Sequence, residues 1–316
     1  MRHFHHTAGR EAISRHPHTV GRGTGPRHAV TLNIFCLFLF IFAAPTWAWW
    51  GGGHETLTRA SVKALPEELP EFFRAVFAEN AIAHGAHDPD LARNRGAPNA
   101  REAEYAQHYI DVELLQGRPF AKNLRAHIEL CAELGTSYHK VGTLPYALAE
   151  WTERLAIAFA EHRKWPDNPI IQSKCLVYAG FVAHYAQDMC QPLHLTVHFN
   201  GRAKSDGSSP GTGIHENVDA LIERLELKAD DLAKDQEITP VEELLPAIFQ
   251  QVEAGHRLVD SVYDLEEELK NYREPTPALV DFANERAREA VRWTSAIYLT
   301  AWRMSDEIPL PGWLNR

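Results

Sequence analysis

The segment His184-Tyr-Ala-Gln-Asp188-Met-Cys-Gln-Pro-Leu-His194 combines a helical spacing with a helix stop. Its first histidine and its aspartate lie four residues apart, so both side chains leave the same face of a helix. Pro192 lacks a backbone donor and clashes with the preceding turn, so we expect it to end or kink the helix. Residues 170–185 are apolar on nearly every side, which predicts a helix buried all round. The ligand-type side chains are therefore expected on a rigid, central helix.

A second pair with the same spacing follows at His215 and Asp219, twenty-one residues after His194. One such pair on a helix is usually exposed or makes a capping interaction. Two copies within thirty-six residues indicate something more specific. Imidazole nitrogens and carboxylate oxygens suit zinc in catalytic sites, where thiolate is not required. The spacing predicts a metal centre with more than one ion.

The chain begins with a segment typical of a secretory leader. Residues 1–28 are basic and rich in histidine, and residues 29–44 contain an apolar run that is short for a membrane span. Thr46 and Ala48 place small residues at the −3 and −1 positions of a signal peptidase site. We expect a signal peptide over residues 1–48, with its n-region at 1–28 and its h-region at 29–44. The mature protein would be secreted or periplasmic; an uncleaved anchor is the alternative.

The remaining residues, 49–316, are expected to form one domain. The chain has 316 residues and 45% hydrophobic content, which is enough for a large core. Apolar side chains recur at three- and four-residue steps, and alternating strand patterns are scarce. We predict an all-α fold: a single multi-helix domain built around a buried central helix. Nothing in the sequence implies a membrane span in the mature chain or a stable protein partner.

The charge of the chain bears on its substrate. The predicted leader contains five arginines and one glutamate, so its removal takes the net charge from −10 to −14. A strongly acidic protein does not attract nucleic acid through its overall field. Any anionic substrate must therefore be bound locally, by metal ions or by a few arginines.

The predicted mature N-terminus, Trp49-Trp-Gly-Gly-Gly-His54, also carries ligand groups. A free α-amino group and the carbonyl of the same residue can chelate one metal ion in a five-membered ring. The three glycines would let this terminus fold inward beside His54, because glycine reaches conformations that other residues avoid.

With these residues in place, the chain resembles the superfamily of zinc-dependent phospholipases C and single-strand-specific nucleases. The resemblance runs from Trp49 through the C-terminal helix. Residues 184–194 resemble the family's His-Tyr-x-x-Asp-x-x-Gln-Pro-x-His motif at every fixed position. The resemblance implies an all-α domain with a trinuclear zinc site. Residues 49–316 are accordingly expected to be a zinc-dependent phosphodiesterase domain that binds about three zinc ions.

The resemblance also implies a ligand set. Asp88 and Asp188 are expected to be catalytic: Asp88 would orient or deprotonate the attacking water, and Asp188 would bridge two ions. His84, His87 and Asp90 are alternatives to Asp88, since they lie close to it in the sequence. The implied ligands are Asp88, His108, His184 and Asp188 for the first zinc, His194, His215 and Asp219 for the second, and Trp49 and His54, with Asp188, for the third.

The implied activity is phosphodiester hydrolysis by a zinc-bridging hydroxide. Paired ions lower the pKa of a bridging water and neutralise the charge that builds on the phosphodiester. Tyr109, His198 and Arg202 lie beside the motif residues and are expected to contact substrate.

The sequence does not match either the nuclease branch or the phospholipase branch of the family in every feature. Asp219 and the six-residue spacing from Trp49 to His54 resemble the nucleases, whereas Ala220 stands where nucleases often carry an asparagine that helps to bind a base. We expect a secreted nuclease that acts on single-stranded nucleic acid or nucleotides. A phospholipase C that cleaves phospholipid head groups is the alternative, and a zinc-binding protein without turnover is a third.

Overall fold

The structure is a computed structural model that describes residues 49–205 and 207–314. These residues fall in one compact unit. The predicted signal peptide, residues 1–48, lies outside the described residues.

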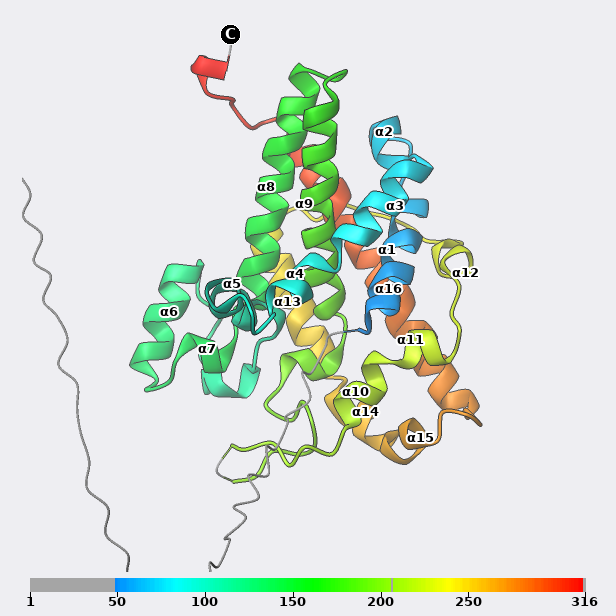
Figure 1. The fold of residues 1–316 in the computed structure, drawn as a ribbon. Helices are drawn as coiled ribbons and strands as arrows, with labels where there is room; N and C mark the ends of the chain where they lie inside the picture. The colour runs from blue at the N-terminus through cyan, green and yellow to red at the C-terminus, as the bar shows by residue number, and fades with distance from the viewer. Residues whose placement is uncertain (1–48, 206, 315–316) are drawn as a thin grey trace, which may run out of the picture. The chain divides into compact units, whose positions relative to one another are not determined.

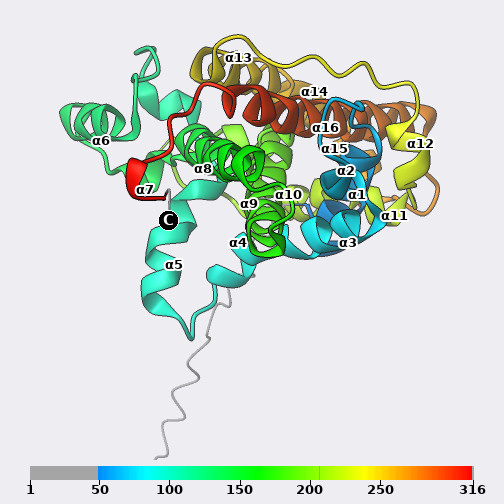
Figure 2. The same ribbon diagram turned by 90° about the horizontal axis from the view of Figure 1, so that it is seen from above.

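The all-α prediction is confirmed. Within the described residues, β-structure is limited to two isolated bridges, Ile110 with Gly142 and Phe199 with Gly201. The centre of the fold is made by three long helices. They are α8 (Leu144–Lys164), α9 (Pro169–Asp188) and α16 (Pro277–Met304). Helices α8 and α9 lie side by side, and α16 packs against both of them (Figures 1 and 2).

Shorter helices surround this centre. Among them, α1 packs on α3 and α16, and α13 packs on α8. The shorter α-helices are α1 (Gly51–Lys63), α2 (Glu71–Arg74), α3 (Val76–Gly85), α4 (Asp88–Ala92), α5 (Pro98–Glu104), α6 (Leu124–Glu133), α7 (Tyr138–Val141), α10 (Ile214–Asp219), α11 (Leu221–Arg224), α12 (Ala229–Ala233), α13 (Leu244–His256), α14 (Val259–Asp264) and α15 (Glu266–Lys270). The 3-10 helices are η1 (Tyr105–His108), η2 (Val112–Leu115), η3 (Pro192–Leu195) and η4 (Gly312–Leu314).

Helix α9 begins and ends where its sequence dictates. The side chain of Asn168 accepts a hydrogen bond from the backbone of Ile170, and Pro169 occupies the first turn, where its missing donor costs nothing. The helix ends at Asp188, and Pro192 then opens η3, which presents His194 one turn beyond the break.

The burial of α9 corrects one prediction. Ile170 is 76% exposed and Val177 is 49% exposed, so the first half of α9 has an open face. Every residue from Val182 to Asp188 is buried. The helix is central, but it is surrounded on all sides only over its last two turns, which carry His184 and Asp188.

A close helix crossing positions that buried end. Gly180 of α9 faces Gly85 of α3 so closely that a Cβ atom on Gly180 would lie 2.6 Å from the carbonyl carbon of Gly85. On the other side of α9, the hydroxyl of Tyr298 in α16 donates to the carbonyl of Ala179 at 2.9 Å. These contacts fix the direction in which the last two turns of α9 point.

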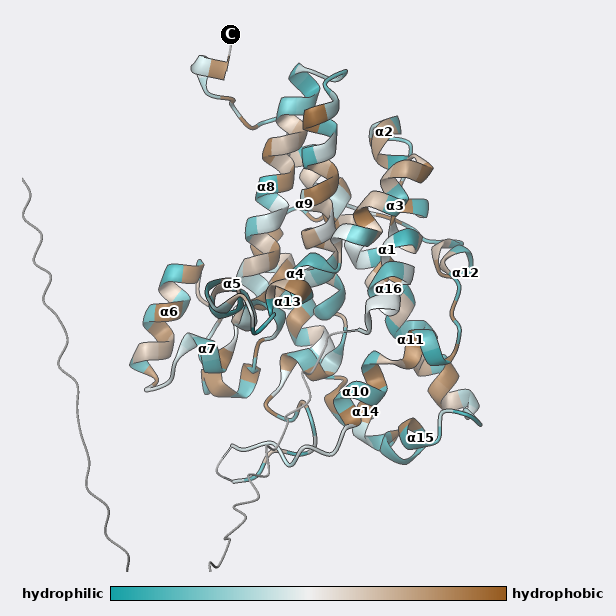
Figure 3. Cartoon of the chain, in the orientation of Figure 1, coloured by the Kyte–Doolittle hydropathy of each residue, from teal (hydrophilic) through white to brown (hydrophobic). Residues whose placement is uncertain are grey.

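The long helices carry polar as well as apolar turns. Figure 3 shows both kinds along α8 and α9. In the part of the chain that the structure describes, no helix has the length and apolar character needed to cross a membrane.

Candidate metal centre

Six segments that are distant in the sequence deliver imidazoles and carboxylates to one buried region. They are α1, α4, η1, the end of α9, η3 and α10. Within the described residues, ligand atoms converge to within 4.8 Å of one another in three groups, and all of the side chains concerned are buried. The groups are His54, Asp90 and His184; His108, His184 and Asp188; and His194, His215 and Asp219.

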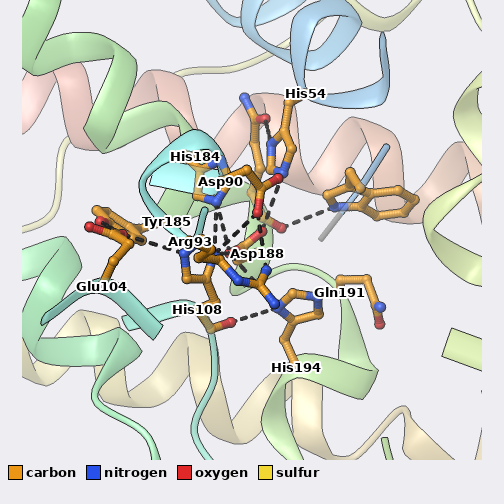
Figure 4. Close-up of polar contacts among 12 residues, drawn as sticks. His54, Asp90, Arg93, Glu104, His108, His184, Tyr185, Asp188, Gln191 and His194 are labelled. Carbon is orange, nitrogen blue, oxygen red and sulfur yellow. Dashed lines mark hydrogen bonds and ion pairs between the residues drawn. The ribbon is translucent and has the colours of Figure 1, made fainter. Parts of the chain in front are cut away.

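Asp188 lies at the centre of this region and is fully buried. One carboxylate oxygen is 3.4 Å from Nε2 of His54, and the other is 3.2 Å from Nδ1 of His108 and 3.3 Å from Nε2 of His184. Figure 4 shows these side chains directed at one another. The carboxylate thus faces members of two of the groups, which is the position that a bridging ligand requires.

Backbone carbonyls fix the orientation of two of the rings. Nδ1 of His184 donates to the carbonyl of Ala86 at 2.8 Å, and Nδ1 of His194 donates to the carbonyl of His108 at 2.6 Å. In a neutral imidazole the other nitrogen then carries the lone pair. For both rings that nitrogen is Nε2, which faces the cluster. Metal-binding histidines are typically oriented by hydrogen bonds of this kind.

His108 has a carboxylate, not a backbone carbonyl, beside the nitrogen that points away from the cluster. Its Nδ1 faces the cluster, while its Nε2 lies 3.3 Å from the carboxylate of Glu104. Glu104 is buried and also accepts a hydrogen bond from the hydroxyl of Tyr185. Glu104 can therefore hold the proton of His108 on the nitrogen that points away from the metal position.

The third group is built from η3 and α10. Nε2 of His215 lies 3.1 Å from Nε2 of His194 and 3.2 Å from one oxygen of Asp219. The other oxygen of Asp219 accepts a hydrogen bond from Gln191 at 2.7 Å. Burial raises the pKa of Asp219 well above its ordinary value and lowers the pKa of His215 well below its own. A bound cation would reverse the effect on Asp219, because its charge favours the ionised carboxylate.

When no metal is bound, a proton on His184 balances the negative charge of Asp188. Burial opposes the charged form of His184, but the charge of Asp188 outweighs it and raises the pKa of His184 to about 9. The pKa of Asp188 is held well below its usual range, because the attraction of His184 and His194 outweighs burial. A proton on His184 occupies the position that a metal ion would take, so metal binding should release it.

Several buried polar atoms test whether these residues fit metal ions. Both oxygens of Asp188, Nε2 of His54 and one oxygen of Asp219 have no hydrogen-bond partner. A buried polar group without a partner costs about 1–3 kcal/mol, and more when it is charged. Divalent ions would satisfy these atoms at once. A set of imidazole nitrogens and carboxylate oxygens with no thiolate fits zinc.

The structure does not bring Asp88 into these groups, and Asp90 stands in its place. Asp90 is buried, and one of its oxygens is 3.9 Å from Nδ1 of His108, whereas Asp88 is only half-buried. Two residues along a helix differ by about 200° in direction, so the two side chains cannot both face the cluster. Asp90 is therefore the carboxylate of α4 that the structure brings to the groups, and the ligand and catalytic roles of Asp88 stay predictions; the neighbouring His84 and His87 are outside the groups as well.

Trp49 is held by its indole ring, and its role as a metal ligand stays a prediction. It is fully buried, and its indole nitrogen donates to the carbonyl of Gln187 at 3.1 Å. The next residue, Trp50, donates its backbone N–H to the carbonyl of Asp219 at 3.2 Å. The segment that leads into α1 is thus held between the ends of α9 and α10, beside the cluster.

The three side chains that are expected to contact substrate form hydrogen bonds within the protein. The hydroxyl of Tyr109 donates to the carbonyl of His139. Nδ1 of His198 accepts a hydrogen bond from the backbone of Ala203, and Arg202 pairs with an aspartate of α14 at 2.5 Å. These contacts order the chain around η1 and the loop after η3, and none of them is directed at the metal groups.

Arg93 is a residue of the site that spacing alone did not reveal. It directly follows the end of α4, three residues after Asp90, and its guanidinium is 3.1 Å from the carboxylate of Asp90. Burial lowers the pKa of His194, and the positive charge of Arg93 adds to this effect. Figure 4 shows Arg93 among the histidines. The signal in the sequence was the i, i+3 spacing of Asp90 and Arg93, which is too common to be informative by itself.

Comparisons with known proteins give little further information. No protein-family model matches the chain. No curated protein matches it either. Among solved structures, it is similar to the alpha-toxin of Clostridium perfringens isolated from avian strain SWCP, with 14% identity and a TM-score of 0.44 over 83% of this chain and 67% of that one. At these values the likeness carries no argument about activity.

Proposed function

We propose that this chain is a zinc-dependent phosphodiester hydrolase whose site binds about three zinc ions. One observation carries the proposal. The buried carboxylate of Asp188 has no hydrogen-bond partner and faces imidazoles from α1, η1 and α9. Such an arrangement is costly without cations, because it leaves buried lone pairs without a hydrogen-bond partner.

Zinc bound here would supply a Lewis acid, and a means of lowering the pKa of a bound water to near neutrality. The residues of the chain have complementary tasks. The ring orientations of His184 and His194 are set before substrate arrives, which limits reorganisation during the reaction. Asp90 is placed to orient a nucleophilic water. Arg93 brings a fixed positive charge next to Asp90, where it can bind a non-bridging phosphate oxygen.

Among phosphodiesters, we favour a phospholipid head group. The chain has a net charge of −10, which opposes a polyanion but only weakly affects a zwitterionic lipid. Leu91 directly follows Asp90 and is 58% exposed. The ring of Phe199 packs edge-on against His215, with the ring centroids 6.0 Å apart. Apolar side chains next to two metal groups suit a substrate that has an apolar part.

Single-stranded nucleic acid is the second candidate. It is supported by Asp219 and by the short spacing from Trp49 to His54, which resemble the nuclease branch. Other observations weigh against it. Ala220 is fully buried and offers no side chain to a base, and Tyr109 has its hydroxyl committed to a backbone carbonyl.

A direct comparison of substrates tests the proposal. Protein whose N-terminus is Trp49, as cleavage after Ala48 would leave it, is assayed on phosphatidylcholine vesicles, single-stranded DNA and single-stranded RNA. We expect hydrolysis of the lipid that is abolished by chelation and restored by zinc. Cleavage of the nucleic acids alone would replace the lipid by the second candidate. Zinc binding without turnover on any of the three would overturn the assignment as an enzyme. We also propose that residues 1–48 act as a signal peptide that directs the protein to secretion or export.

A further inference from the structure

Gln187 is a buried residue of α9 that lies next to Asp188 but is not a metal-ligand type. Its side-chain oxygen lies 2.6 Å from Nδ1 of His54, and its side-chain nitrogen donates to Oγ1 of Thr58 at 2.9 Å. Its backbone carbonyl accepts the indole N–H of Trp49. One residue thus contacts both members of the ligand pair expected at the N-terminus.

A glutamine amide has a donor end and an acceptor end. In the structure the acceptor end, Oε1, faces Nδ1 of His54, and the donor end faces Oγ1 of Thr58. Because an amide oxygen only accepts, the proton of the neutral His54 ring lies on Nδ1 in this arrangement. The lone pair then lies on Nε2, which has no hydrogen-bond partner and is 3.4 Å from Asp188.

The packing around His54 also favours a fixed ring with its proton on Nδ1. The rings of His54 and His184 are stacked with centroids 4.2 Å apart, so His54 has little freedom to tilt. Gln187, Thr58 and His54 are all essentially inaccessible to solvent, and water cannot substitute for the amide. Without the acceptor of Gln187, the ring could place its proton on Nε2 and point a donor at the metal position.

We propose that Gln187 is a positioning residue that fixes the tautomer of His54 and anchors Trp49, so that the N-terminal segment can hold one metal ion. The inference rests on the proposed function and deepens it. It assigns the task of orienting His54 to a side-chain amide, whereas backbone carbonyls orient His184 and His194.

Two substitutions at this position separate the hydrogen bond from packing. Gln187→Met preserves the length of the side chain but removes the acceptor, and we expect zinc affinity at one position to fall by about 10–100-fold. Gln187→Glu keeps an acceptor for His54 and can accept from the hydroxyl of Thr58, so it should recover most of that affinity. Gln251→Met is the matched control, because Gln251 is another buried glutamine but contacts no candidate ligand.

The readouts are zinc content, competition titration against a chelator, and the tautomer of His54 by nitrogen-15 NMR in metal-free protein. We expect wild type to carry the proton on Nδ1 and Gln187→Met to lose this preference. Thr58→Val removes the anchor of the amide and should weaken zinc binding in the same direction, which keeps the test valid if Gln187→Met does not fold.

The outcomes distinguish the inference from the proposed function. If wild type binds no zinc, both fail. If wild type binds zinc and Gln187→Met binds it equally well with an unchanged tautomer, the inference alone is wrong. An equal loss of zinc in Gln251→Met would show that the effect is general destabilisation, and would overturn the role of Gln187 as well.

Discussion

Replacing Asp188 by asparagine removes one negative charge and one acceptor from the centre of the site while keeping the size of the side chain. The carboxylate faces Nε2 of His54 at 3.4 Å and two further imidazoles at 3.2 and 3.3 Å. Because it faces members of two groups, the change should affect two metal positions. We expect Asp188→Asn to lose the ion near His54 and to bind the ion near His108 more weakly.

The magnitude follows from the geometry. Deleting one preorganised electrostatic stabiliser costs about 10²–10³ in rate, so turnover should fall by at least that factor while substrate affinity changes less. In metal-free protein, breaking a buried ion pair costs up to about 3–5 kcal/mol. His184 can reduce this cost by losing its proton, since its pKa is raised to about 9 by the charge of Asp188 against the effect of burial. The fold should therefore survive.

Zinc content, initial rates and denaturant unfolding of Asp188→Asn, measured beside wild type, decide the question. Asp167→Asn is the matched control, since Asp167 is exposed and precedes the far end of α9. Full metal content and an unchanged rate in Asp188→Asn would refute the placement of this carboxylate at the centre of the site.

Three further changes have defined outcomes. Asp90→Asn should lower zinc content and Asp88→Asn should not; elemental analysis showing the reverse would return the ligand role to Asp88. Gly180→Ala should destabilise the protein by about 1–3 kcal/mol, because the new Cβ would lie 2.6 Å from Gly85, and an unchanged denaturation midpoint would contradict that close crossing. Burial alone would raise the pKa of Glu113, but hydrogen bonds from a histidine and a threonine hold it at about 2, below its ordinary 4.5. The stability that Glu113 contributes is thus present above about pH 4.5 and is lost as the pH falls towards 2. The difference in unfolding free energy between wild type and Glu113→Gln should therefore shrink over that range. A difference that stays constant with pH would contradict this role of Glu113.

Local rules explain what could be predicted from the sequence. The spacing of His184 and Asp188 and the stop at Pro192 depend only on helix geometry, and the structure has α9 end at Asp188 with η3 following. The pairing of His215 with Asp219 depends on the same geometry, and the two side chains lie 3.2 Å apart within α10. Such features are encoded within a few residues of one another.

The features that were missed depend on packing between distant segments. Asp88 and Asp90 flank one proline, and only the way α4 lies on α9 decides which of them faces inward. Gln187 gains its importance from residues of α1 that are more than a hundred positions away. The exposed side of α9 could not be predicted either, because Ile170 and Val177 are apolar and yet the described part of the chain leaves both of them exposed.

The zinc content of the protein that begins at Trp49, purified without added metal, tests the central claim most directly. Three groups of ligand atoms within 4.8 Å of one another predict about three zinc ions per chain. Chelation should then lower the melting temperature, because ions that bind only the folded state stabilise it. One zinc ion or none at saturation, with a melting temperature that does not respond to chelation, would contradict the assignment of this buried cluster as a metal centre.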